Sequence, residues 1–289
     1  MSARPWLLRL VLAAVLPWIA YVVPATGAEE EPLRFVRRGE TVRTLAGPEI
    51  QARCDVRTVE VPRDPYYGRP KRYRACPLRR VLELGLGGLP EGFADATVLL
   101  RALDGYTRPV HGATLLEEGG FLALADAGRE ASGLTGWEPI DRRRVDPGPF
   151  YMVWTGAGQG DPHAWPWPYQ LAAIEVVAFE ERFPHVLPRG AAEGSAARRG
   201  FAIFRRACLA CHAVNGQGGT VGPELNVPRS IVEYRPEEQI KAYVRDPARF
   251  RYTSMPPHPE LDDGDLDDLI AYFRHMRDHK HDPHADAGP

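Results

Sequence analysis

The sequence predicts two folded domains, a mixed α+β domain followed by an all-α domain. Three observations lead to this prediction. The chain has 289 residues, which suits two domains of roughly 100 to 200 residues each. Residues 29–187 carry short apolar runs separated by Gly and Pro, whereas residues 196–280 show helical periodicity. The segment 188–195 between them is rich in Gly and Ala and has no apolar periodicity, so we interpret it as a linker.

The first 28 residues have the pattern of a signal peptide. Arg4 and Arg9 precede or interrupt an apolar run from Trp6 to Val23, and small residues at 25–28 suit cleavage. The pattern predicts export to the periplasm. The alternative is an uncleaved membrane anchor, which Pro17 and Pro24 disfavour because proline interrupts a helix. We expect contact with a membrane only if this segment is retained.

Composition limits the classes of function. Apolar residues make up 44% of the chain and charged residues 26%, close to the globular mixture of about 45–50% and about 25%. The formal net charge is -2. Such a balance provides no field that would hold phosphate groups, so nucleic acid is not an expected partner.

The N-terminal domain is predicted from its short apolar runs. They lie at Val56–Val61, Ala96–Leu103, Gly120–Ala125, Phe150–Trp154 and Ala172–Phe179. A helical pattern spans Leu78–Leu86. Cys54 and Cys76 of this domain would meet an oxidising compartment after export, so a disulfide between them is one expectation. Packed thiols and a metal ligand are the alternatives.

The C-terminal domain has three predicted helices. Ser195 is available as an N-cap for a helix in which Ala197, Gly200, Phe201, Phe204 and Cys208 share one face. A second helix starts near Pro236 and stops at Pro247. A third starts after Asp262, which can cap it, and its basic residues follow its acidic ones. We expect residues 281–289 to form a disordered tail.

The strongest motif in the chain is Cys208-Leu209-Ala210-Cys211-His212. Two thiols three positions apart can each bond one vinyl group of a haem, and the following histidine can then bind the iron as an axial ligand. Zinc would need two further ligands at suitable spacing, and no second cysteine pair of this kind exists. The motif therefore predicts one covalently bound haem c.

Residues of about 196–280 resemble the class I cytochromes c. The resemblance lies in Gly200-x-x-x-Phe204, Tyr272, Gly222-Pro223-Glu224-Leu225, Asp246-Pro247-Ala248-Arg249 and Thr253-Ser254-Met255-Pro256-Pro257. It implies that Gly200 lets the last helix cross closely at Tyr272, and that the Pro223 carbonyl accepts the His212 N–H. It also implies that Met255 is the sixth iron ligand.

Four methionines occur, and Met255 is the only one in a segment that suits this role. His258, in the same loop, is an alternative ligand, and core packing is an alternative role for Met255. An iron with both axial positions filled has no position for substrate, so the expected chemistry is outer-sphere electron transfer.

Residues of about 33–183 resemble the sulfite oxidase-like molybdopterin-binding domain. The similar segments are Leu99–Tyr106, Pro147–Trp154 and Trp167–Glu175, with Pro77–Leu82 similar to an early helix of that family. The family binds molybdenum through a cysteine in a C-x-G-N-like context. Neither Cys54 nor Cys76 lies in such a context, so molybdopterin is not an expected cofactor.

The sequence thus predicts an exported monohaem cytochrome, an electron carrier rather than a stand-alone enzyme. It would pass single electrons from a periplasmic dehydrogenase to an acceptor such as a cytochrome or an oxidase, with the N-terminal domain as a docking scaffold. Two alternatives stay open. One is a molybdenum-dependent oxidoreductase whose electrons pass to the haem, and the other is a non-catalytic docking subunit of a respiratory complex.

Overall fold

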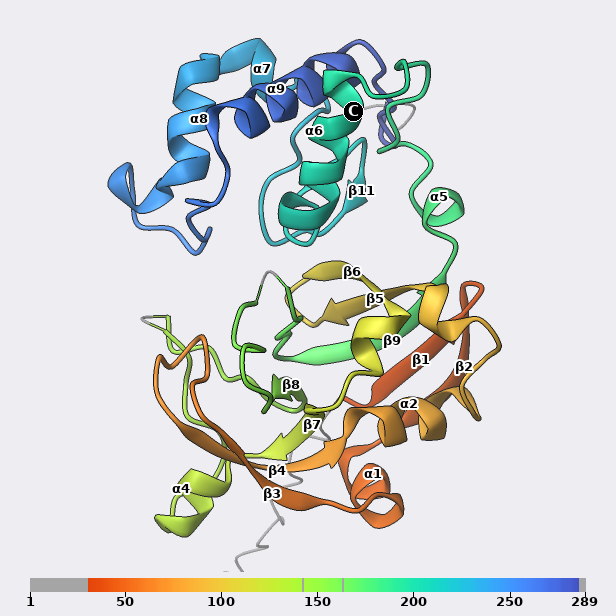
Figure 1. The fold of residues 1–289 in the computed structure, drawn as a ribbon, viewed down its shortest axis with the longest axis vertical. Helices are drawn as coiled ribbons and strands as arrows, with labels where there is room; N and C mark the ends of the chain where they lie inside the picture. The colour runs from red at the N-terminus through yellow and green to blue at the C-terminus, as the bar shows by residue number, and fades with distance from the viewer. Residues whose placement is uncertain (1–30, 142, 163, 286–289) are drawn as a thin grey trace, which may run out of the picture.

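The computed structural model describes residues 31–141, 143–162 and 164–285. The predicted signal segment lies outside these residues. None of the helices in this part of the chain is long and apolar enough to cross a membrane. In Figure 1 the N-terminal region forms the lower half of the molecule, and the C-terminal helices form the upper half.

The N-terminal region contains two β-sheets, which confirms the prediction of a mixed α and β region. The first sheet has the order β2-β1-β9-β5-β6, with bounds Leu33–Arg37 (β1), Glu40–Leu45 (β2), Thr97–Ala102 (β5), Thr107–His111 (β6) and Leu171–Val177 (β9). The second has the order β3-β4-β7-β8, with bounds Arg57–Val61 (β3), Lys71–Pro77 (β4), Gly120–Ala125 (β7) and Tyr151–Trp154 (β8). Neighbouring strands are antiparallel except β1 and β9, which are parallel.

Short helices connect these strands: α1 (Gly47–Arg53), α2 (Leu78–Leu86), η1 (Phe93–Asp95), α3 (Gly112–Leu115), α4 (Ala127–Ala131) and α5 (Phe179–Arg182). The predicted helix at Leu78–Leu86 is confirmed with the same bounds. It buries Leu78, Val81 and Leu82. A Cβ added to Gly85 of this helix would overlap the Phe35 ring, so glycine lets α2 approach β1 closely.

The C-terminal half begins with α6 (Ala196–Ile203), which continues as a π-helical turn, η2 (Phe204–Cys208). The remaining elements are β10 (Ala213–Val214), β11 (Gln217–Gly218), α7 (Ile231–Tyr234), α8 (Glu237–Arg245), η3 (Pro247–Arg249) and α9 (Asp263–Arg277). The three predicted helices are therefore present. The Asp262 side chain accepts a hydrogen bond from Asp265 N at 2.8 Å and caps α9 as expected.

Two local predictions differ from the structure. Ser195 occupies the N-cap position of α6 but makes no capping hydrogen bond, and its hydroxyl is buried without a partner. His281, which we placed in a disordered tail, stacks on the His185 ring with centroids 3.6 Å apart. The backbone N–H of His281 also donates to Asn215 Oδ1 at 3.1 Å. The chain therefore packs against the rest of the molecule beyond Lys280.

The two halves share a contact along the first sheet. Alternate residues of β5 point to opposite sides, as strand geometry requires. Val98 and Leu100 belong to the core of the N-terminal region. Leu99 instead packs in the core of the C-terminal helices, together with Phe179 and Phe183 of the connecting segment. The C-terminal half therefore packs against the side of β5 that carries Leu99.

A buried carboxyl group lies inside the N-terminal region. Asp64 Oδ2 accepts hydrogen bonds of 2.9 Å from the hydroxyls of both Tyr73 and Tyr151. The side chain is fully buried. Burial raises the pKa of Asp64 above its usual value, while the hydrogen bonds act in the opposite direction.

We expect this raised pKa to appear in the pH dependence of stability. The folded chain holds the Asp64 proton to a higher pH than the unfolded chain does. The free energy of unfolding therefore falls as pH rises from about 4 through the folded pKa. Asp64→Asn removes this titration. Its stability relative to the parent should improve between pH 4 and pH 7 by an amount on the order of 1 kcal/mol, measured by urea unfolding. The exposed Asp55→Asn variant serves as a control, and parallel pH profiles for parent and Asp64→Asn would contradict the assignment.

Candidate functional site

The cysteine-histidine motif lies where the first C-terminal helix ends. Cys208 is the last residue of η2, and the chain then turns so that His212 N donates to Cys208 O at 2.9 Å. The two cysteines are not joined to each other. These hydrogen bonds place Cys208, Cys211 and His212 on one turn of the chain, which suits attachment of one haem by two bonds.

The His212 ring is oriented by a backbone carbonyl. Its Nδ1 lies 2.8 Å from the Pro223 oxygen. Because a carbonyl oxygen only accepts, Nδ1 carries the proton and Nε2 carries the lone pair that an iron ion needs. A Cβ on Gly222 would lie 2.7 Å from His212 Nδ1, so only glycine lets the loop pass this close to the ring.

Burial keeps the side chains of the motif uncharged. It lowers the pKa of His212, which favours the neutral imidazole that binds metal. Burial also raises the pKa of the Cys208 thiol to about 12 and that of the Cys211 thiol to about 11. At neutral pH both cysteines are therefore thiols. This donor set fits haem c.

Met255 and His258 follow η3 in the segment before α9. Met255 is half-buried and packs against the core of the C-terminal helices. His258 is 3% exposed, and its Nδ1 lies 3.0 Å from Glu260 Oε1. The Glu260 contact involves Nδ1 of His258, as the Pro223 contact involves Nδ1 of His212, so it leaves His258 open as an alternative to Met255.

The crossing of α6 and α9 closes the core behind the motif. A Cβ on Gly200 would overlap the Asp268 carbonyl and would lie 2.9 Å from Tyr272 Cβ. Glycine therefore permits the close crossing that the resemblance implies. Phe204 packs between the helices, with its ring centroid 5.2 Å from that of Tyr272.

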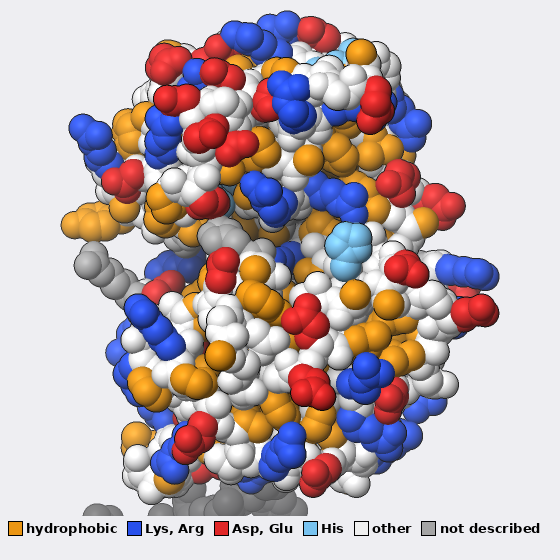
Figure 2. Space-filling view, in the orientation of Figure 1, with side chains coloured by type: hydrophobic (Ala, Val, Ile, Leu, Met, Phe, Trp, Pro, Cys, Tyr) orange, Lys and Arg blue, Asp and Glu red, His pale blue; other side chains and the backbone are white. Residues whose placement is uncertain are grey.

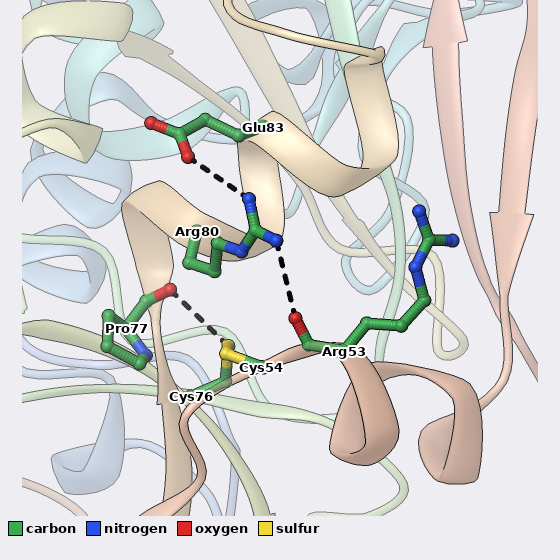
Figure 3. The surroundings of a disulfide bond; sticks show 6 residues. All are labelled: Arg53, Cys54, Cys76, Pro77, Arg80 and Glu83. Atoms are coloured by element: carbon green, nitrogen blue, oxygen red, sulfur yellow. Dashed lines mark hydrogen bonds and ion pairs between the residues drawn. A yellow bond between two sulfur atoms is a disulfide. The ribbon is translucent and has the colours of Figure 1, made fainter.

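Cys54 and Cys76 lie far from the haem motif in sequence and are joined by a disulfide, with Cα atoms 6.0 Å apart. Figure 3 shows the bond beneath α2, where Arg80 donates to the Arg53 carbonyl at 3.5 Å. The disulfide ties the end of α1 to β4. It leaves neither cysteine as a thiolate for a molybdenum ion.

One feature of the site has no sequence signal that we identified. The turn between β5 and β6 touches the haem motif directly, because Thr107 N donates to Ala210 O at 2.8 Å. Backbone hydrogen bonds between distant segments do not depend on residue type. Gly105, in this turn, is the one residue type here that could have indicated a close approach of two backbone segments.

Comparison with known proteins defines the class of this site. The cytochrome c family model matches residues 197–277. The C-terminal part of the chain is therefore a cytochrome c domain, and the N-terminal region is a mixed α/β structure joined to it.

Among curated proteins, the chain is similar to cytochrome c oxidase subunit 2 of Alkalihalophilus pseudofirmus. The two are 33% identical over 89 residues, which is 28% of this chain and 26% of that protein. The chain thus spans about a quarter of the length of that relative.

Proposed function

We propose that this protein is an exported electron carrier with one haem c, bound through Cys208 and Cys211. His212 and Met255 are the axial ligands, and Pro223 orients the histidine. The protein passes single electrons between a periplasmic dehydrogenase and a cytochrome or oxidase acceptor. The N-terminal region serves as its docking scaffold.

The orientation of His212 is the observation that carries this proposal. The 2.8 Å contact from His212 Nδ1 to the Pro223 oxygen leaves the lone pair of Nε2 for binding an iron ion, which supports His212 as a ligand. Two unpaired cysteines lie within four residues of it. Each thiol can add across one vinyl group, with its sulfur bonding one carbon and its hydrogen passing to the other. This addition transfers no electron.

The remaining residues would favour reversible electron transfer. A haem c supplies a one-electron couple at its iron. The packed side chains of Phe204 and Tyr272 exclude water behind the motif, which disfavours the more highly charged ferric state. With Met255 as sixth ligand no open position remains, so electrons would cross without a bond to substrate. The likeness to an oxidase subunit supports redox proteins as partners.

A sulfite oxidase-like fold for the N-terminal region is part of the same proposal. Two sheets with mixed topology are compatible with it. The thiolate that would bind molybdenum does not fit the residues present, because Cys54 and Cys76 are disulfide-bonded. We therefore favour a scaffold over a molybdenum-dependent oxidoreductase. Metal analysis of protein made in a cofactor-competent host should find iron at one per chain, and stoichiometric molybdenum would contradict the scaffold role.

The attachment site can be tested by its products. Full-length protein made in a host that attaches haem c should give a c-type pyridine haemochrome and keep its haem on a denaturing gel. Cys208→Ser/Cys211→Ser should lose all covalent haem, because both thioether bonds are removed. Cys54→Ser/Cys76→Ser is the matched control and should retain it. Covalent haem in the first double variant would refute the proposed attachment.

A further inference from the structure

The N-terminal region is hydrogen-bonded to the haem motif itself. Thr107 N, at the start of β6, donates to the oxygen of Ala210, which lies between the two motif cysteines. In the opposite direction, Thr220 N, in the loop that follows the haem motif, donates to Gly105 O at 3.1 Å. In Figure 1 β5 and β6 form the part of the sheet nearest to α6 and β11. The turn at 103–106 thus lies against the motif.

Gly105 allows this approach. Its φ is +93°, and a Cβ built there would overlap the Thr220 hydroxyl. A larger residue would therefore suffer both backbone strain and a collision with the loop. The contact depends on the absence of a side chain at this one position.

Side chains at the other end of β5 also join the two halves. The Arg205 guanidinium of η2 lies 4.0 Å from the centroid of the Phe179 ring, and its Nη2 lies 3.5 Å from Thr97 Oγ1 of β5. Leu99 is fully buried within the core of the C-terminal helices. A shared apolar core, rather than a tether, therefore fixes the two halves at this place.

Two residues of opposite charge stand next to the backbone groups that contact the motif and its loop. Asp104 precedes Gly105, and Arg108 follows Thr107. Arg108 is hydrogen-bonded to the Tyr106 hydroxyl and donates to the Pro162 carbonyl, so its charge is held in place. Figure 2 shows basic and acidic side chains along the boundary between the two halves.

We infer that the turn at 103–106 covers the haem edge bonded to Cys211, and that Arg108 and Asp104 tune the iron potential in opposite directions. The inference rests on the proposed haem attachment, because a thioether bond places that edge beside the Cys211 sulfur. The N-terminal region then occupies this edge of the haem, so no external protein can contact the haem there. Redox partners must approach the haem elsewhere.

The signs follow from the charge of the iron. Oxidation adds one positive charge to the haem, so a nearby cation disfavours the ferric state and raises the reduction potential. Arg108→Gln should therefore lower the potential, and Asp104→Asn should raise it. Arg108 is half-buried whereas Asp104 is exposed. Water screens the exposed charge more strongly, so the shift for Asp104→Asn should be the smaller one.

Redox titration of the full-length holoprotein tests this prediction. Arg108→Lys keeps the charge and should keep the potential close to that of the parent. Arg72→Gln removes an exposed arginine from β4 of the other sheet and measures the effect of net charge alone. Shifts of opposite sign in Arg108→Gln and Asp104→Asn, both larger than in Arg72→Gln, support the inference. Shifts no larger than the control, or of the same sign, overturn it.

Hydrogen exchange provides a second measurement that does not depend on the potential. The amides of Thr107 and Thr220 should exchange slowly in the parent protein and at least tenfold faster in Gly105→Val, whereas the amides of β1 keep their protection. Rapid exchange of both amides in the parent would overturn the contact. A parent protein without covalent haem would instead refute the proposed function, so the two failures are distinguishable.

Discussion

Replacing Lys71 with methionine is expected to lower the free energy of unfolding by about 3–5 kcal/mol. Lys71 Nζ lies 2.6 Å from Asp126 Oδ2 and 2.8 Å from Glu138 Oε2. The Asp126 side chain is fully buried and also caps α4 through the amides of Gly128 and Arg129. Methionine fills a similar volume but leaves this carboxylate without a cation in a site that water cannot reach.

Denaturant unfolding of the disulfide-bonded protein measures this effect. Arg72→Met changes the next residue of β4, which is exposed, and should cost less than about 1 kcal/mol. If Lys71→Met cost no more than this control, the buried ion pair would contribute little to the free energy of unfolding.

Met255→Ala is expected to open the sixth coordination position of the haem iron. Loss of the thioether should lower the reduction potential by on the order of a tenth of a volt, within the roughly 0.8 V over which axial ligands act. The ferrous variant should also bind carbon monoxide, which the parent should not. Redox titration and the absorption spectrum under carbon monoxide measure these two changes.

Met276→Leu is the control for Met255→Ala. Met276 is 1% exposed on α9 and packs in the core of the C-terminal helices, so this variant should keep both the potential and the closed coordination. His258→Ala provides the opposing test. Carbon monoxide binding by His258→Ala, together with an unchanged Met255→Ala, would identify His258 as the ligand.

Much of the local structure follows from short stretches of sequence. The bounds of α2 were predicted correctly because its apolar residues repeat at helical spacing between a proline and a glycine. The cap at Asp262 follows from the spacing, because a carboxylate three residues before Asp265 can accept a hydrogen bond from the Asp265 amide. Ser195 occupies the N-cap position as predicted, but its hydroxyl makes no capping bond.

The pairing of strands that are far apart along the chain could not be predicted from the sequence. In the parallel pairing of β1 with β9, Arg34 is the partner of Ala173, more than a hundred residues away. No residue pattern in either strand predicts this pairing. The buried carboxyl of Asp64 was also missed. An aspartate followed by proline, as in Asp64-Pro65, is typical of a turn. Only the fold brings the hydroxyls of Tyr73 and Tyr151 to the Asp64 carboxylate.

The sequence by itself indicated the chemistry that we propose for this protein, because a haem attachment motif is local. Cys208, Cys211 and His212 lie on one turn of chain, so their spacing is enough to define what they can bind. The tertiary structure alone decided which other residues surround that motif. The turn at 103–106 reaches Ala210 through backbone hydrogen bonds, which depend on the path of the chain rather than on residue identity.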